Sequence, residues 1–225
     1  MRLLIDDANI EKIRRILEYY PCDGVTTNPS ILAKTGRPPY EVLQEIRALI
    51  GPRGELHVQA ISADAEGMLA EAEKITRILG KNTYIKIPAI PEGIKAMKAL
   101  KAAGYRVTAT AIYTPMQAYL SAKAGADYVA PYINRIDNLG ADGIATAKMI
   151  HNILVNNGYE TKVLAASFKN SQQVQALCEA GVGAATANPD IIEGLIRNQS
   201  VAAAVEAFVA DFQKLCGDGK TMLDC

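Results

Sequence analysis

The chain has 225 residues, 49% of them apolar, and its 24 basic and 24 acidic side chains give no net charge. This is the composition of a folded globular protein with one substantial core, and the charge balance argues against nucleic-acid binding. Two acids directly follow the first apolar run, unlike a signal peptide, and no apolar stretch approaches the roughly 20 residues that span a bilayer. We therefore expect a soluble, cytoplasmic protein without a membrane partner.

Short β-branched runs alternate with longer helical patterns along the chain. The expected strands are residues 2–6, 24–27, 56–60, 84–87, 106–111, 128–131, 162–167 and 183–186. The expected helices are residues 10–20, 40–50, 63–79, 91–102, 115–124, 140–157, 171–179 and 189–198, followed by one more at 201–215.

Eight successive strand–helix units predict a parallel sheet closed into a (β/α)8 TIM barrel, with an additional C-terminal helix. An open doubly wound sheet is the alternative, but its usual six strands would leave two units unplaced. No linker or low-complexity tract divides the chain. We expect one domain over residues 1–225, in which residues 200–225 form the last helix and a tail.

Cysteine and histidine are scarce and widely spaced. The four cysteines form no CxxC pair, and His57 and His151 lie far apart in the sequence. Structural zinc sites usually show closely spaced Cys or His pairs, so we expect no metal site. For both histidines we expect packing or surface roles.

Polar residues cluster where the predicted strands end. Strand side chains alternate between the helices and the barrel axis, and the active site of this fold lies at the C-terminal strand ends. Such polar groups are costly inside a barrel unless they meet each other or a ligand. The polar positions expected to face the axis are Asp6, Gln59, Lys86, Thr110 and Ser167; Thr26, Thr27 and Asn28 end the second strand, and Tyr132, Asn134 and Arg135 follow the sixth.

Lys86 is the most informative single residue, because apolar neighbours on its strand place it on the inward face. An ordinary lysine at a strand end would extend its charged group into solvent. A buried lysine instead has a lowered pKa, and its neutral amine can attack a carbonyl to form a Schiff base.

The other candidates have structural alternatives. Asp6 and Gln59 could hydrogen-bond to each other across the barrel, and Tyr132 could simply pack. Arg135 and Ser167 could hold a phosphate, since both donate hydrogen bonds, but Arg135 could equally form an ion pair with the nearby Asp137.

Four segments in the same order resemble the small transaldolase family, and within it most closely the fructose-6-phosphate aldolases. They are residues 24–30 (GVTTNPS), 85–88 (IKIP), 130–137 (APYINRID) and 165–169 (AASFK). The resemblance runs from Asp6 nearly to the C-terminal residue. It implies a class I aldolase on a TIM barrel, with Lys86 as the Schiff-base lysine and no metal or organic cofactor. It also implies a homodecamer of two pentamers, in which the last helix packs on a neighbouring subunit.

The family has two activities that use the same lysine. Transaldolases, which transfer a dihydroxyacetone unit between sugar phosphates, generally have Glu and Phe at the positions of Gln59 and Tyr132. The resemblance therefore implies an aldolase that interconverts fructose 6-phosphate with dihydroxyacetone and glyceraldehyde 3-phosphate. Transaldolase is the alternative, followed by a non-catalytic phosphosugar-binding barrel.

The resemblance also implies a role for each candidate residue. Tyr132 would transfer a proton through a water held by Gln59 and Thr110. Asp6 and Asn28 would orient the hydroxyls of the ketone, and Thr26 and Thr27 would also bind the substrate. Arg135 and Ser167 would hold the phosphate of the aldehyde.

Overall fold

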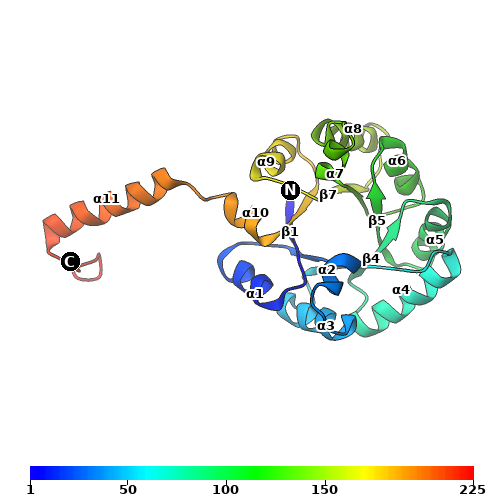
Figure 1. The fold of residues 1–225 in the computed structure, drawn as a ribbon, viewed down its shortest axis with the longest axis horizontal. Helices are drawn as coiled ribbons and strands as arrows, with labels where there is room; N and C mark the ends of the chain where they lie inside the picture. Colours follow the sequence, from blue (N-terminus) through cyan, green and yellow to red (C-terminus); the bar gives the residue numbers. More distant parts are fainter. The chain divides into compact units, whose positions relative to one another are not determined.

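A computed structural model describes residues 1–225 and shows a closed barrel of eight parallel strands (Figure 1). The strands pair in chain order, and β8 closes the barrel against β1. The fold is therefore a (β/α)8 TIM barrel with a C-terminal helix, as predicted. The strands are β1 (Arg2–Asp6), β2 (Gly24–Thr26), β3 (Glu55–Gln59), β4 (Thr83–Pro88), β5 (Arg106–Ile112), β6 (Tyr128–Pro131), β7 (Lys162–Ala165) and β8 (Ala184–Ala187).

Helices follow every strand and begin at recognisable sequence signals. Side chains of Asn9, Asp64 and Asn170 accept hydrogen bonds from backbone N–H groups in the first turns of their helices, and several helices have proline in the first turn. The helices are α1 (Ile10–Tyr19), α2 (Pro29–Ala33), α3 (Pro39–Ile50), α4 (Ala65–Leu79), α5 (Pro91–Ala102), α6 (Pro115–Lys123), α7 (Ile133–Asn138), α8 (Gly143–Asn156), α9 (Ser171–Glu179), α10 (Pro189–Gly194) and α11 (Gln199–Cys216).

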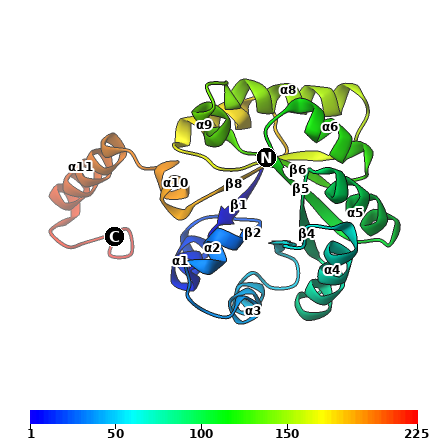
Figure 2. The same cartoon turned by 45° about the vertical axis from the view of Figure 1, so that its right-hand side comes forward.

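The chain divides into two compact units, residues 1–192 and residues 193–225. The first contains the barrel. The second contains α11, one continuous helix in which no residue is buried, and the tail that follows it (Figure 2). That all 225 residues act as one domain stays a prediction. None of the helices is long and apolar enough to cross a membrane.

Side chains of the strands alternate between two cores, as period-2 geometry requires. One set, which includes Ile5, Val25 and Ile85, belongs to the main core of fully buried residues between strands and helices. The other set points into the barrel, where Tyr84 and Tyr128 join a separate apolar cluster. Lys86 shares the inward face with Tyr84, two residues earlier on the same strand.

Two helices were not expected from the sequence, and three elements end earlier than expected: β2 at Thr26, β7 at Ala165 and α10 at Gly194. α2 and α7 have five and six residues, too short for a full amphipathic repeat to be visible in the sequence. Of the helix expected at residues 140–157, residues 143–156 form a helix, which is α8. β7 ends at Ala165, two residues before the predicted end.

Candidate active site

Lys86 lies inside the barrel near the C-terminal end of β4, and only 6% of its surface is exposed. It does not extend into solvent. Its Nζ donates a hydrogen bond to the backbone carbonyl of Thr27, at 2.7 Å. Burial lowers the pKa of Lys86, Asp6 opposes this effect, and Arg135 adds to it. Burial therefore shifts Lys86 toward the neutral amine, which is the nucleophilic form of lysine.

Asp6 ends β1 on the inward face and belongs to a chain of buried hydroxyls. The Oγ1 of Thr26 donates a hydrogen bond to Asp6 Oδ1 at 2.8 Å and lies 2.7 Å from Thr186 Oγ1. Burial raises the pKa of Asp6, while Lys86 and the Thr26 hydroxyl oppose the rise. The carboxyl group of Asp6 thus has Thr26 as its hydrogen-bond partner, and the alternative bond to Gln59 is not formed.

Tyr132 follows β6, and its hydroxyl lies 2.8 Å from Thr110 Oγ1. The ring is held from two sides. Tyr113 packs edge-on against it at 5.6 Å between centroids, and the Arg135 guanidinium lies over its face, 4.4 Å from the centroid. Tyr132 therefore lines the cavity with a ring whose position is fixed by packing on two sides.

Arg135 has no ion pair with Asp137, so that alternative is wrong for this structure. Asp137 instead accepts hydrogen bonds from the backbone N–H of Gly143, at 2.7 Å, and from Gln173 Nε2, at 2.8 Å. A side chain at Gly143 would overlap the carbonyl of Ile133, so glycine permits α7 and α8 to approach this closely. Asp137 thus fixes α7 and leaves the Arg135 charge available to a ligand.

Ser167 lies next to the cavity, but not for the predicted reason. The prediction that it lies on the inward face of its strand is wrong, because Ala165 belongs to the outer core and Leu164 to the inner one. Ser167 comes after the strand, and its φ of +63° is in the left-handed region, which is strained for a residue with a side chain. This irregular backbone, rather than strand alternation, brings Ser167 to the cavity.

The remaining predicted site residues, Asn28, Thr27 and Gln59, differ in how close they come to the cavity. Asn28 lines the cavity, and its side chain also accepts a hydrogen bond from the Ile31 N–H at the start of α2. The Thr27 side chain is fully buried and donates to the carbonyl of His57, so only the Thr27 backbone carbonyl reaches Lys86. Gln59 is half-buried and lies opposite Lys86 in the β3–β4 register, without lining the cavity itself.

The cavity beside Lys86 is small, about 30 Å³, and a wider hollow of about 810 Å³ shares Asp6, Asn28 and Arg135 with it. Thr186 was not anticipated, although it is the only polar residue of β8 and alternation places it inward. The cavity is lined by Asp6, Thr26, Asn28, Lys86, Ala130, Tyr132, Arg135, Leu164, Ala166, Ser167 and Thr186. No group of three or more Cys, His, Asp or Glu side chains is placed to hold a metal ion.

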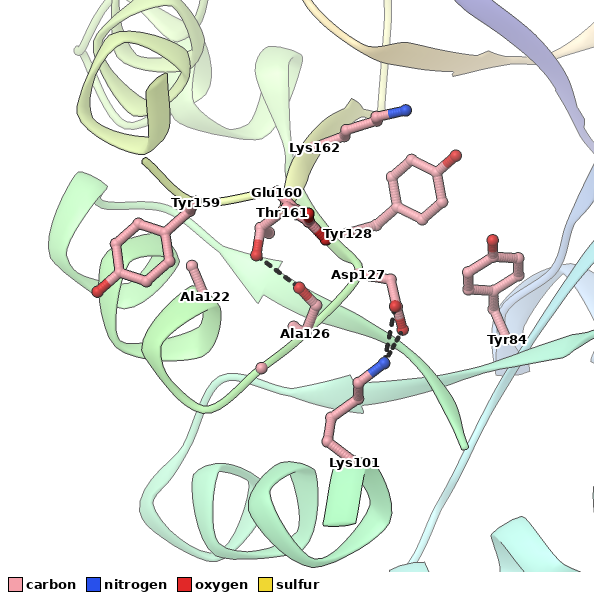
Figure 3. A pocket seen from close by; sticks show the side chains of 11 residues that line it. Tyr84, Lys101, Ala122, Ala126, Asp127, Tyr128, Tyr159, Glu160, Thr161 and Lys162 are labelled. Atoms are coloured by element: carbon pink, nitrogen blue, oxygen red, sulfur yellow. Dashed lines mark hydrogen bonds and ion pairs between the residues drawn. The ribbon is translucent and has the colours of Figure 1, made fainter. Parts of the chain in front are cut away.

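Another cavity, about 460 Å³, opens where β4, β6 and β7 begin, at the opposite end of the barrel (Figure 3). Its central charges neutralise each other, since Lys101 Nζ lies 2.7 and 2.8 Å from the two carboxylate oxygens of Asp127. Thr161 donates to the Ala126 carbonyl in the same wall. Because its central charges and this hydroxyl are already paired, this cavity is a weaker active-site candidate.

His57 lies in the barrel interior between the two ends and is completely buried. Its ring stacks on Tyr84, with 4.5 Å between centroids, and its Nδ1 lies 2.9 Å from Thr108 Oγ1. Burial lowers the pKa of His57 well below the usual value, and the charge of Lys86 adds to this effect. His57 is therefore a neutral packing residue at ordinary pH.

Comparison with known proteins agrees with this geometry. Residues 3–224 match the transaldolase/fructose-6-phosphate aldolase family model. A Streptococcus pneumoniae protein named probable fructose-6-phosphate aldolase is 41% identical over 94% of this chain and 96% of its own length. Proteins named probable transaldolase, from Hydrogenobaculum sp. and Aquifex aeolicus, are 38% and 36% identical over 96% of this chain and 98% of their own lengths. The chain therefore belongs to the transaldolase/fructose-6-phosphate aldolase family.

Proposed function

We propose that this protein is a class I aldolase that cleaves and forms fructose 6-phosphate through a Schiff base on Lys86. The observation that carries the proposal is a buried lysine with a lowered pKa whose amine borders a polar cavity. The bond to the Thr27 carbonyl uses one N–H of the neutral amine and leaves its lone pair for attack on a carbonyl carbon.

The proposed cleavage begins when Lys86 Nζ adds to the C2 carbonyl of fructose 6-phosphate and water leaves to give a protonated imine. The C3–C4 bond then breaks. Its electron pair moves toward the iminium nitrogen to form an enamine, while the C4 hydroxyl loses its proton and becomes the aldehyde of glyceraldehyde 3-phosphate. Protonation of C3 restores the imine, and water releases dihydroxyacetone and regenerates the amine.

Each neighbouring residue has a part in this sequence. Asp6 and Asn28 orient the hydroxyls of the dihydroxyacetone portion, which enters the cavity beside Lys86. Tyr132 delivers the proton to C3 through a water positioned by Thr110 and Gln59. The Arg135 guanidinium, free of Asp137, and the Ser167 hydroxyl bind the phosphate.

The choice of aldolase over transaldolase depends on Tyr132 and Gln59. The tyrosine hydroxyl can protonate the enamine and so release the ketone, and its bond to Thr110 fixes its position. Glutamine cannot titrate as glutamate would, which leaves Tyr132 as the proton donor. The specific support for transaldolase, the second candidate, is that several relatives carry this name.

Two experiments test the proposal. Borohydride reduction in the presence of dihydroxyacetone should attach a covalent adduct to Lys86, identified by peptide mass spectrometry; an adduct elsewhere, or none, would contradict the mechanism. Aldol cleavage of fructose 6-phosphate and transfer from sedoheptulose 7-phosphate should then be measured side by side. Faster transfer would favour transaldolase, and ligand binding without adduct or turnover would favour a non-catalytic barrel.

We also propose that the active form is a cytoplasmic homo-oligomer, a decamer of two pentamers by resemblance. In support, α11 exposes Val201, Val205 and Phe208, with spacings of four and three residues that place them on one face of the helix. This face would pack on another copy of the chain. Light scattering of the purified protein tests the assembly.

A further inference from the structure

The second unit contains a pair of thiols that the aldol chemistry does not use. Cys216 is the last residue of α11, and Cys225 lies in the tail beyond it. Their Sγ atoms are 3.0 Å apart, with Cys216 half-buried and Cys225 exposed. A disulfide requires about 2.05 Å between the sulfur atoms, so a shift of about 1 Å in an exposed tail would permit the bond.

The sequence of the tail explains why the two cysteines meet. Gly217 ends the helix with a φ of +105°, and Gly219 follows with a φ of +71°, conformations that glycine adopts without strain. Asp224 Oδ2 then accepts hydrogen bonds from the Thr221 N–H, at 2.7 Å, and from its hydroxyl, at 3.0 Å. These turns direct the tail back so that Cys225 lies beside the end of α11 (Figure 1).

The other two cysteines lack this arrangement. Cys22 is half-buried, and burial together with the charge of Asp23 raises its pKa to about 11, which suppresses the reactive thiolate. Cys178 is exposed on α9 and has no thiol neighbour. They serve as internal controls without a neighbouring thiol. The contact with Cys225 raises the pKa of Cys216 as well, so the pair differs from Cys22 by its neighbouring thiol and not by its acidity.

We propose that Cys216 and Cys225 are a redox-sensitive pair that forms an intramolecular disulfide by exchange with a low-molecular-weight disulfide. One thiol loses its proton, and the thiolate attacks the small disulfide, forming a mixed disulfide and releasing one small thiolate. The second thiol, also deprotonated, attacks the protein sulfur of the mixed disulfide and releases the other small thiolate. The protein loses two hydrogen atoms, and one disulfide is reduced to two thiols, so atoms and electrons balance.

The test uses the full-length protein with oxidised glutathione, followed by thiol blocking with N-ethylmaleimide at low pH. Trypsin cuts after Lys214 and Lys220, which places the two cysteines on separate peptides, 215–220 and 221–225. The expected product is a disulfide-linked pair of these two peptides, which is absent before oxidation and lost on reduction. Cys178 should carry glutathione, confirming an active oxidant, and Cys22 should remain a thiol.

Two outcomes would overturn the proposal. One is glutathione on Cys216 and Cys225 separately with no linked pair. The other is a linked pair that appears only in covalent dimers on a non-reducing gel, since the bond would then join two chains. In a Cys225→Ser variant, Cys216 should stop at the mixed disulfide with glutathione. None of the residues that line the cavity belongs to α11 or the tail, so fructose 6-phosphate cleavage by the reduced variant provides a separate measure of the proposed function.

Discussion

Replacing Tyr132 with phenylalanine removes one hydroxyl and leaves the ring in place. The two ring contacts, with Tyr113 and with Arg135, do not involve the hydroxyl and should persist. The lost interaction is the 2.8 Å bond to Thr110, whose side chain is completely buried and would be left without this partner. We expect a loss of about 1–2 kcal/mol in unfolding free energy, which is the cost of an unpaired buried hydroxyl.

The expected effect on activity is larger than the effect on stability. A positioned general acid contributes about 10²–10⁴-fold, which corresponds to roughly 2.7–5.5 kcal/mol of activation barrier. A domain with a stability of about 5–15 kcal/mol remains folded after losing 1–2 kcal/mol. Release of free dihydroxyacetone should therefore fall at least about 100-fold, while borohydride trapping on Lys86 is retained because the amine is unchanged.

The assay is aldol cleavage of fructose 6-phosphate, with glyceraldehyde 3-phosphate measured by a coupled enzyme, beside denaturant unfolding of each variant. Tyr113→Phe is the matched control, because Tyr113 belongs to the same aromatic pair but its hydroxyl does not contact Thr110. A Tyr132→Phe variant that cleaves the sugar at nearly the wild-type rate, or a Tyr113→Phe variant that loses as much activity, would refute the role of the Tyr132 hydroxyl as proton donor.

Further predictions concern the lysine, its charged neighbour, the phosphate site and the assembly. Lys86→Met should abolish both turnover and borohydride trapping; residual trapping at the wild-type rate would assign the imine to another lysine. Asp6→Asn should move the acid limb of the pH profile of kcat/KM to lower pH, because the Asp6 carboxylate raises the pKa of Lys86 and its removal leaves more neutral amine; a shift to higher pH would contradict this. Ser167→Gly should raise KM about 10-fold for glyceraldehyde 3-phosphate but not for glyceraldehyde, because a hydrogen bond to a charged group is lost. The free energy of unfolding should stay the same or rise, because the φ of residue 167 is positive. Equal effects on both aldehydes would argue against a phosphate contact. Phe208→Lys should lower the mass measured by light scattering, and an unchanged oligomer would place the interface elsewhere.

The barrel and most of the site could be predicted from the sequence because strand geometry is local. Alternation with a period of two places Asp6, Lys86 and Thr110 inward whatever the rest of the chain does. The same rule finds Thr186 once the boundaries of β8 are known.

What could not be predicted depends on irregular backbone and on contacts between distant segments. Ser167 reaches the cavity because its own backbone lies in the left-handed region, which no periodicity in the sequence indicates. Arg135 forms no ion pair with Asp137 because Gly143 and Gln173 donate hydrogen bonds to the Asp137 carboxylate. Both donors lie outside the segment that contains Arg135 and Asp137. α2 could have been anticipated from the Asn28-Pro29 cap, whereas α7 has no side-chain cap.

The aromatic cluster below Lys86 has a kinetic consequence. His57, Tyr84 and Tyr128 pack together in the barrel interior, with at most 8% of any of them exposed. These rings separate the cavity beside Lys86 from the opposite end of the barrel. In the proposed mechanism, the ketone on Lys86 would lie deeper in the barrel than the aldehyde, so glyceraldehyde 3-phosphate would leave before dihydroxyacetone. The proposed enamine would then meet either a proton or a second aldehyde. Which of the two arrives first would decide between lyase and transferase chemistry on the same intermediate.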